Sequence, residues 1–333
     1  MHSLDNSRDY SIDWLKTIGT LCLFLAHVDA PFWIKEARGF DVPLMVFLSG
    51  MLAGGSFSRA SSSGEYIKRR INRLVVPTWI FLVFFYICMA VVNQLPNYLT
   101  IIKSFLFQRD GGIAGYTWII LVYIYCSCLI PVLVGYLNNK KISLLLLTII
   151  MIGYELLCSF THLAQIRILY YTFFTIVPYG TILFIAMNFK KQTKRGRALL
   201  AISALAFHTI YAIVLKLKWG YYVPLGEYKY PARFYYISYA IPIIVVLYMF
   251  FRQDFFRKKN YAVIEFVSRH SLWIYLWHIF VLAILNFVLK IQNWVICYAL
   301  LVGLSVGITF MQNTLVSRIE RKHEYAWLNY FIG

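Results

Sequence analysis

The 333 residues are 60% hydrophobic and 18% aromatic, and only 14% of them are charged. Soluble domains are about half apolar and a quarter charged, so this composition excludes an ordinary soluble domain and indicates a polytopic membrane protein. The 32 Lys and Arg outnumber the 14 Asp and Glu, and the net charge of +18 is either an orientation signal or a means of binding an anion.

The chain contains about ten apolar runs, each close to the roughly 20 residues that span a bilayer. The runs are continuous and do not alternate, which favours helices over barrel strands. The polar N-terminus has no apolar leader, so we expect no cleaved signal peptide. The sequence predicts an all-α polytopic domain over 1–333, with 316–333 as a short cytoplasmic tail and spans at 13–33, 40–57, 74–95, 116–137, 142–160, 168–189, 198–217, 233–251, 271–290 and 292–315.

Most of the Lys and Arg fall on one side of these spans, chiefly in loops 58–73, 190–197 and 252–269 and in the tail. An excess of basic residues in short loops marks the cytoplasmic side, so both termini are expected in the cytoplasm. The same basic rim suits an anionic ligand or lipid headgroup. The bilayer is an expected partner, and a nucleic acid is not.

The six cysteines lie in apolar runs without a Cys-x-x-Cys pair, so neither disulfides nor a metal site is expected.

The first span carries four acidic or basic residues, Asp13, Lys16, His27 and Asp29. Placing a charge at mid-bilayer costs roughly 2.5–3.5 kcal/mol, so each of these residues is expected to have a partner or a function. On one continuous helix, Lys16 and His27 would lie within about 20° of the same face and about 16 Å apart. A lone intramembrane histidine is more often hydrogen-bonded between helices than catalytic, but the shared stripe with Lys16 favours a functional role.

Other polar residues in the spans have no partner that the sequence reveals. Glu155 and His208 are expected to be structural. Ser271, Tyr275 and His278 fall within about 60° of each other on a helix, as in a site or a packing network. The aromatic loop 216–236 suits sugar stacking, although an interfacial aromatic belt explains it better.

The first-span residues Arg8, Asp13, Lys16 and His27 resemble the signature of the acyltransferase-3 family, in which a basic residue precedes a histidine by ten intervening positions. The sequence around Asp13 and the segment 43–50 are similar to the corresponding sequences of the fucose-4-O-acetylase-like branch of this family. Asp41 departs from that branch, which usually has histidine there.

The resemblance continues along the chain in the same order. Arg70-Ile-Asn-Arg73 with Pro77 matches the family's Arg-x-x-Arg and proline, and Tyr116-Thr-Trp118 matches its aromatic motif. Ser271, Tyr275 and His278 match its ninth-span pattern. The family implies transfer of an acyl group, usually acetyl, from cytosolic acyl-CoA to a hydroxyl of an extracytoplasmic or lipid-linked glycan. It also implies a location in the inner or plasma membrane of a bacterial cell.

Transfer to an alcohol needs a general base, stabilisation of an oxyanion and a leaving group, and a thioester supplies the last. We assign His27 as the base, grouped with Asp13, and Lys16, Arg70 and Arg73 to the phosphates of acyl-CoA, with acetyl-CoA as the expected co-substrate and no metal. Ser49 is either a nucleophile or, beside Gly50, a small packing residue. The expected substrate-contacting or supporting residues are Arg8, Asp41, Ser49, Trp118, Glu155, Ser271, Tyr275 and His278.

Two other classes of protein fit part of the sequence. A polysaccharide or glycolipid exporter would explain ten spans and intramembrane polar residues. It would not explain a Lys–His pair together with Arg-x-x-Arg, and no inverted repeat is recognisable. An acyltransferase-like sensor would not need both His27 and Lys16.

Overall fold

The computed structural model describes residues 9–109, 112–139, 144–259, 261–321 and 325–332. Within these ranges the secondary structure is helical, without a β-strand and with one isolated bridge between Lys229 and Ala232. A helix satisfies its backbone hydrogen bonds internally where water is absent, which is why long apolar runs take this form. The expected all-α membrane class is confirmed.

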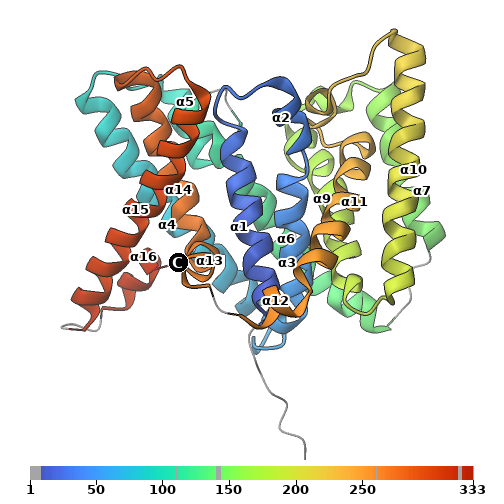
Figure 1. Cartoon of the computed structure of the whole chain (residues 1–333), viewed down its shortest axis with the longest axis horizontal. Coiled ribbons are helices and arrows are strands. Elements are labelled where there is room, and N and C mark those ends of the chain that lie inside the picture. The colour runs from blue at the N-terminus through green and yellow to red at the C-terminus, as the bar shows by residue number, and fades with distance from the viewer. Residues whose placement is uncertain (1–8, 110–111, 140–143, 260, 322–324, 333) are drawn as a thin grey trace, which may run out of the picture.

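The principal helices alternate in direction through the molecule, with short helices at its two ends (Figure 1). They are α1 (Tyr10–Leu25), α2 (Phe32–Ala37), α3 (Asp41–Phe57), α4 (Ser63–Val91), α5 (Tyr98–Phe105), α6 (Trp118–Asn139), α7 (Leu144–Phe160), α8 (Arg167–Tyr171), α9 (Phe173–Phe189), α10 (Lys194–Trp219), α11 (Phe234–Phe251), α12 (Asp254–Lys258), α13 (Ala262–Arg269), α14 (Ser271–Ala283), α15 (Trp294–Glu320) and α16 (Asn329–Ile332). Four 3-10 turns and a π-helical turn connect them: η1 (Ile113–Thr117), η2 (Leu163–Gln165), η3 (Leu225–Tyr228), η4 (Ile284–Val288, π-helical) and η5 (Ala326–Leu328).

Eight stretches of the described chain are long and apolar enough to cross a bilayer. They include α3, α4, α6, α9, α10, α11, α14 and α15. The other two expected spans correspond to α1 and α7, which are shorter helices of 16 and 17 residues. The helix of each expected span is therefore present, and the start of the run at 142–160 lies outside the described residues.

The first expected span is wrong in its extent. Asp9 caps α1 by accepting a hydrogen bond from the Ser11 amide at 3.2 Å, but the helix ends at Leu25 instead of continuing to residue 33. The amide of His27 turns back to the Phe24 carbonyl at 3.0 Å, so His27 lies in a turn beyond the helix. Pro31, which lacks an amide hydrogen, then precedes the separate helix α2.

Helix α4 begins at Ser63, about three turns before the apolar run that predicted the third span. Ser62 accepts a hydrogen bond from the Glu65 amide at 3.1 Å, and the Glu65 carboxylate accepts one from the Ser61 amide at 2.6 Å. This capping arrangement starts the helix at Ser63. Arg70 and Arg73 consequently lie within a formed helix, and their three-residue spacing places them on one side of it.

Helices α1 and α3 occupy the middle of the molecule, with α14 and α15 on one side and α10 and α11 on the other (Figure 1). Helix α1 begins at the same end at which α12, α13 and α16 lie, whereas α2 and α5 lie at the opposite end (Figure 1). The basic loops 58–73, 190–197 and 252–269 adjoin the first end. By the positive-inside rule, that end would face the cytoplasm.

Gly50 allows α3 to approach α9 closely. A Cβ atom at this position would lie 2.7 Å from the Cβ of Ala186 and 2.8 Å from the carbonyl oxygen of Leu183. We predict that Gly50→Ala separates the two helices and lowers the free energy of unfolding by about 1–3 kcal/mol, the usual cost of overpacking. Thermal unfolding of the purified protein in detergent measures it.

Gly54→Ala is the matched control, because a Cβ atom at Gly54, one turn further along α3, meets nothing within 4 Å. Equal thermal stability of the two variants would contradict the close-approach explanation.

Candidate active site

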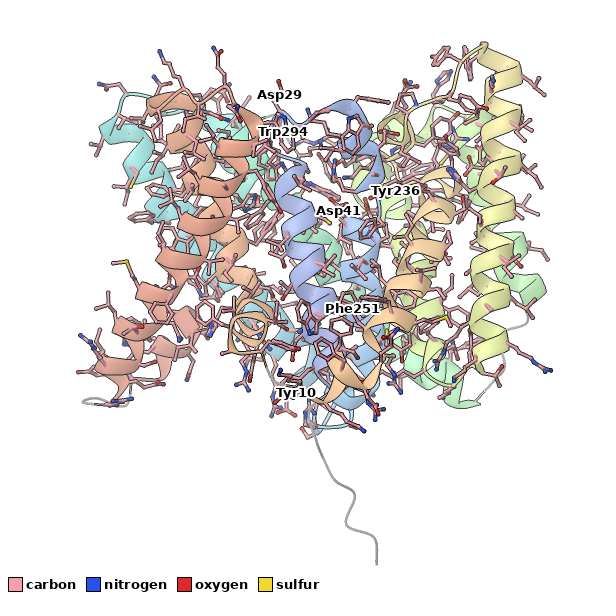
Figure 2. The ribbon with its side chains drawn as sticks, in the orientation of Figure 1. Tyr10, Asp29, Asp41, Tyr236, Phe251 and Trp294 are labelled. Carbon is pink, nitrogen blue, oxygen red and sulfur yellow. The ribbon has the colours of Figure 1, made fainter. Side chains whose placement is uncertain are left out.

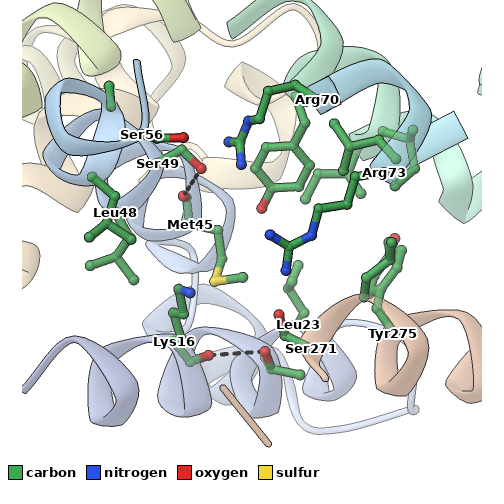
Figure 3. A pocket seen from close by; sticks show the side chains of 18 of the residues that line it. Lys16, Leu23, Met45, Leu48, Ser49, Ser56, Arg70, Arg73, Ser271 and Tyr275 are labelled. Atoms are coloured by element: carbon green, nitrogen blue, oxygen red, sulfur yellow. Dashed lines mark hydrogen bonds between the residues drawn. The ribbon is translucent and has the colours of Figure 1, made fainter. Parts of the chain in front are cut away.

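A cavity of about 180 Å³ lies among helices α1, α3, α4, α6 and α14. Lys16 enters it from α1, and Arg70 and Arg73 enter it from α4. Figure 3 shows the three side chains extending toward a common space from opposite sides. The structure thus brings together the three basic residues that the sequence analysis assigned to phosphate binding. Helices α2 and α3 separate α1 from α4 along the chain.

Helical periodicity explains which arginine faces the cavity. Arg69 forms an ion pair with Glu65 one turn earlier and stays 62% exposed, while Arg70 and Arg73 line the cavity. In the part of the chain that the structure describes, no carboxylate lies within 4.0 Å of Arg70 or Arg73, and Nε of Arg70 is buried without a hydrogen-bond partner. Unpaired guanidinium groups facing a cavity are suited to binding an anion.

The cavity wall also contains hydroxyl groups. Ser49 lines it from α3 and donates to the Met45 carbonyl at 3.2 Å, as a helical serine commonly does. Ser271 and Tyr275 line it from α14. Tyr123 also lines it, and its buried hydroxyl has no partner among the described residues. Tyr123 was missed from the sequence, because nothing distinguishes this tyrosine from the many others in the spans.

His27 does not line this cavity, because α1 ends before it. The prediction that Lys16 and His27 share one helical stripe is therefore wrong. His27 instead lines a second cavity, of about 360 Å³, together with Asp29 and Trp294. Asp29 and Trp294 lie at the end of the molecule opposite Tyr10 (Figure 2).

Aromatic rings separate the two cavities. Tyr275 lines the basic cavity, and its hydroxyl donates to the Tyr116 carbonyl at 2.5 Å. The rings of Tyr275 and His278 are 4.6 Å apart between centroids, and those of His278 and His27 are 5.2 Å apart. The His27 ring also lies 3.8 Å from that of Tyr116. We call Tyr116, Tyr275 and His278 the aromatic partition, because their rings lie between the basic cavity and His27.

His278 is a buried polar group beside His27. Its side chain is fully buried, and Nδ1 contacts the carbonyl oxygen of Tyr275. The other ring nitrogen, Nε2, has no hydrogen-bond partner in the described chain. His278 can therefore make one further hydrogen bond, through Nε2.

Asp41 is fully buried and holds two cations. Arg38 donates to Oδ2 at 2.5 Å, the Val42 amide donates to Oδ1 at 2.7 Å, and Nζ of Lys229 lies 4.0 Å from Oδ1. Arg38 and Lys229 are close enough for their charges to act on His27. The sequence offered no signal for this cluster, because Lys229 comes from a loop almost two hundred residues away.

The remaining candidate residues do not line the basic cavity. Asp13, in the first turn of α1, accepts from Ser268 at 2.5 Å and is separated from His27 by the rest of α1, roughly 18 Å long, and the turn that follows it. Glu155 accepts from Arg233 at 2.6 Å and from Tyr211 at 2.5 Å, a structural network. Trp118 packs edge-on against Tyr230 beside another, smaller cavity.

The remaining polar residues singled out from the sequence are Arg8 and His208. Arg8 lies outside the described residues. His208 bonds through Nδ1 to the Tyr235 carbonyl at 3.0 Å and stacks on that tyrosine, as expected for a structural histidine. No group of three or more His, Cys, Asp or Glu that could hold a metal is found where residues are described.

Comparison with known proteins gives one match. The family model of the acyltransferase-3 type, described as an acyltransferase domain, matches residues 9–311, a range that contains both cavities and the aromatic partition. Neither the curated proteins nor the solved structures contain a match.

Removing the carboxylate charge of Asp41 would leave two buried cations without their counter-charge. We predict that Asp41→Asn lowers the free energy of unfolding by about 3–5 kcal/mol, the cost of breaking a buried pair by removing one partner. Asp29→Asn is the control, because Asp29 pairs with Lys35 at 2.9 Å but is 96% exposed. Thermal unfolding in detergent compares the two variants, and similar losses in both would contradict a buried structural ion cluster.

Proposed function

Since the chain belongs to the acyltransferase-3 family and is a membrane acyltransferase, we propose that it carries an acetyl group from cytosolic acetyl-CoA to a hydroxyl of an extracytoplasmic or lipid-linked glycan. The observation that carries the proposal is the convergence of Lys16, Arg70 and Arg73 on one cavity that ends at the aromatic partition beside His27.

The basic cavity suits the donor. The phosphates of CoA need several positive groups, and an arginine pair without carboxylate partners in the described chain offers planar donors for phosphate oxygens. The end of the molecule with the basic loops would face the cytoplasm, where acetyl-CoA is made available. The phosphates would bind at Arg70, Arg73 and Lys16, and the pantetheine arm would extend inward toward Tyr275.

The chemistry would take place at His27. Its imidazole would accept the proton of the glycan hydroxyl while the hydroxyl oxygen attacks the thioester carbonyl carbon. The tetrahedral intermediate would then collapse by breaking the C–S bond. The CoA thiolate leaves and takes the proton back from the imidazolium, so that the products are an acetyl ester and CoA.

The aromatic partition would have to open for this reaction. Reacting atoms must come within about 3–3.5 Å of each other, whereas Tyr275 and His278 now lie between the basic cavity and His27. The hydrogen bond from Tyr275 to the Tyr116 carbonyl would break as the acetyl group passes. A partition that opens only for the thioester would keep water away from it.

The donor site predicts a defined kinetic change. Arg70→Gln and Arg73→Gln should each raise the KM for acetyl-CoA by about tenfold or more, because each removes a charged hydrogen-bond donor to phosphate. Steady-state transfer assays on purified protein measure this rise. Arg69→Gln, on the exposed side of the same helix, should leave KM unchanged. If Arg69→Gln changes KM as much as the other two, the arginines contribute only general charge.

The base assignment predicts loss of turnover without loss of donor binding. His27→Ala should lower kcat by about a hundredfold or more, the usual contribution of a general base. Binding of acetyl-CoA, measured by titration calorimetry in detergent, should stay at the wild-type value because His27 does not line the basic cavity. His162→Ala, an exposed histidine, is the control. Wild-type turnover in His27→Ala would remove His27 from the mechanism.

A further inference from the structure

We propose that the second cavity, around His27, binds an uncharged sugar unit of the acceptor, with Trp294 as the surface on which the sugar ring stacks. This inference rests on the proposed acyl transfer to a glycan. Beyond that proposed function, the inference specifies where the acceptor binds, which residues recognise the acceptor and that the bound sugar is uncharged.

The position of this cavity suits an acceptor that arrives from outside. Its volume of about 360 Å³ lies near the lower limit of the roughly 300–1,000 Å³ typical of small-molecule pockets. It opens at the end of the molecule opposite the start of α1, where Asp29 and Trp294 lie close together (Figure 2). His27 is part of its lining, so a hydroxyl bound here would face the proposed base.

The lining has the chemistry of a carbohydrate site. Trp294 is half-buried and offers an apolar ring face, on which the C–H face of a sugar can pack. Asn286 and Gln292 lie beside it, and each amide both donates and accepts hydrogen bonds. Hydroxyl groups also donate and accept, so amides match them better than charged groups do.

The charges of the lining favour an uncharged sugar. The residues that line this cavity include no Lys or Arg in the described chain. The one carboxylate, Asp29, is 96% exposed and already paired with Lys35 at 2.9 Å. An anionic sugar would therefore lose its hydration without a cationic group in the cavity lining itself to replace it.

Two other places on this side are less suitable for a sugar. The cavity beside Trp118 contains Arg109 and Lys229 but has a volume of only about 20 Å³, and Arg109 lies 3.6 Å above the ring centre of Tyr230. In the aromatic loop that suggested sugar stacking, Tyr235 and Tyr236 are 5% and 1% exposed, so their faces are unavailable. The exposed rings of Tyr222 and Trp219 already have Lys216 and Lys218 over them, at 4.4 and 5.0 Å from the ring centres.

The backbone at the cavity rim departs from regular helix. Helix α14 widens into the π-helical turn η4, which contains Asn286, and Lys290 follows in the left-handed region with φ of 48°. Both features are uncommon, and π-helical turns occur frequently at functional sites. Asn293 then accepts hydrogen bonds from the amides of Val295 and Ile296 at 3.0 and 3.2 Å, which fixes the start of α15 at Trp294.

The test separates acceptor binding from donor turnover. Wild-type protein, Trp294→Ala and Asn286→Ala are purified at full length. Each is assayed for binding to uncharged hexose oligosaccharides and to matched oligosaccharides with uronic acids. Acetyl transfer to both sets, and the KM for acetyl-CoA, are measured on the same preparations. Val295→Ala is the control, because Val295 neighbours Trp294 but is 52% exposed and does not line the cavity.

We expect Trp294→Ala to weaken binding of the uncharged oligosaccharides, and to raise their KM in transfer, by about tenfold, with the KM for acetyl-CoA unchanged. Asn286→Ala should change the same quantities by a smaller factor. Wild-type binding in both variants, or tighter wild-type binding of the uronic set, would overturn the inference while leaving acetyl transfer intact. Conversely, sugar binding that depends on Trp294 without any acetyl transfer in the wild type would overturn the proposed function and keep the acceptor site.

Discussion

A charged side chain at bilayer depth must find a partner or perform a function, and this constraint organises the interior of the protein. Asp41 is buried and neutralised by Arg38 and Lys229, and Glu155 is held by Arg233. Arg70 and Arg73 are different, because the described residues offer them no carboxylate and they face a cavity. The contrast separates charges that hold helices together from charges that face a cavity.

The Asp41 cluster also positions the site. Asp41 starts α3, and Arg38 lies in the turn that joins α2 to α3, so their bond fixes the segment that follows His27. Lys229 attaches the loop before α11 to the same carboxylate. The positive charges beside His27 are thus partly neutralised by Asp41.

Two cavities at opposite ends, with a thin aromatic partition between them, match a reaction whose substrates arrive from opposite sides of a membrane. In the proposed reaction neither substrate would have to cross, because only the acyl group would pass the partition. Tyr275 and His278 come from α14, and the same helix continues into the π-helical turn at the rim of the second cavity. A movement of α14 would therefore reach both cavities.

The sequence by itself determined the helical membrane class and most spans, because hydrophobic run length reports directly on the bilayer. It also determined that Arg70 and Arg73 share a face, because a three-residue spacing does so on any helix. It could not determine where α1 ends, since the turn at Ala26 and His27 depends on local bonding and on Pro31 beyond it. Only the tertiary structure decided that Lys16 meets the two arginines, that Asp41 meets Lys229 and that His27 joins Trp294 in a separate cavity. Those encounters join residues far apart in the chain, and packing between helices, not the periodicity of any one helix, brings them together.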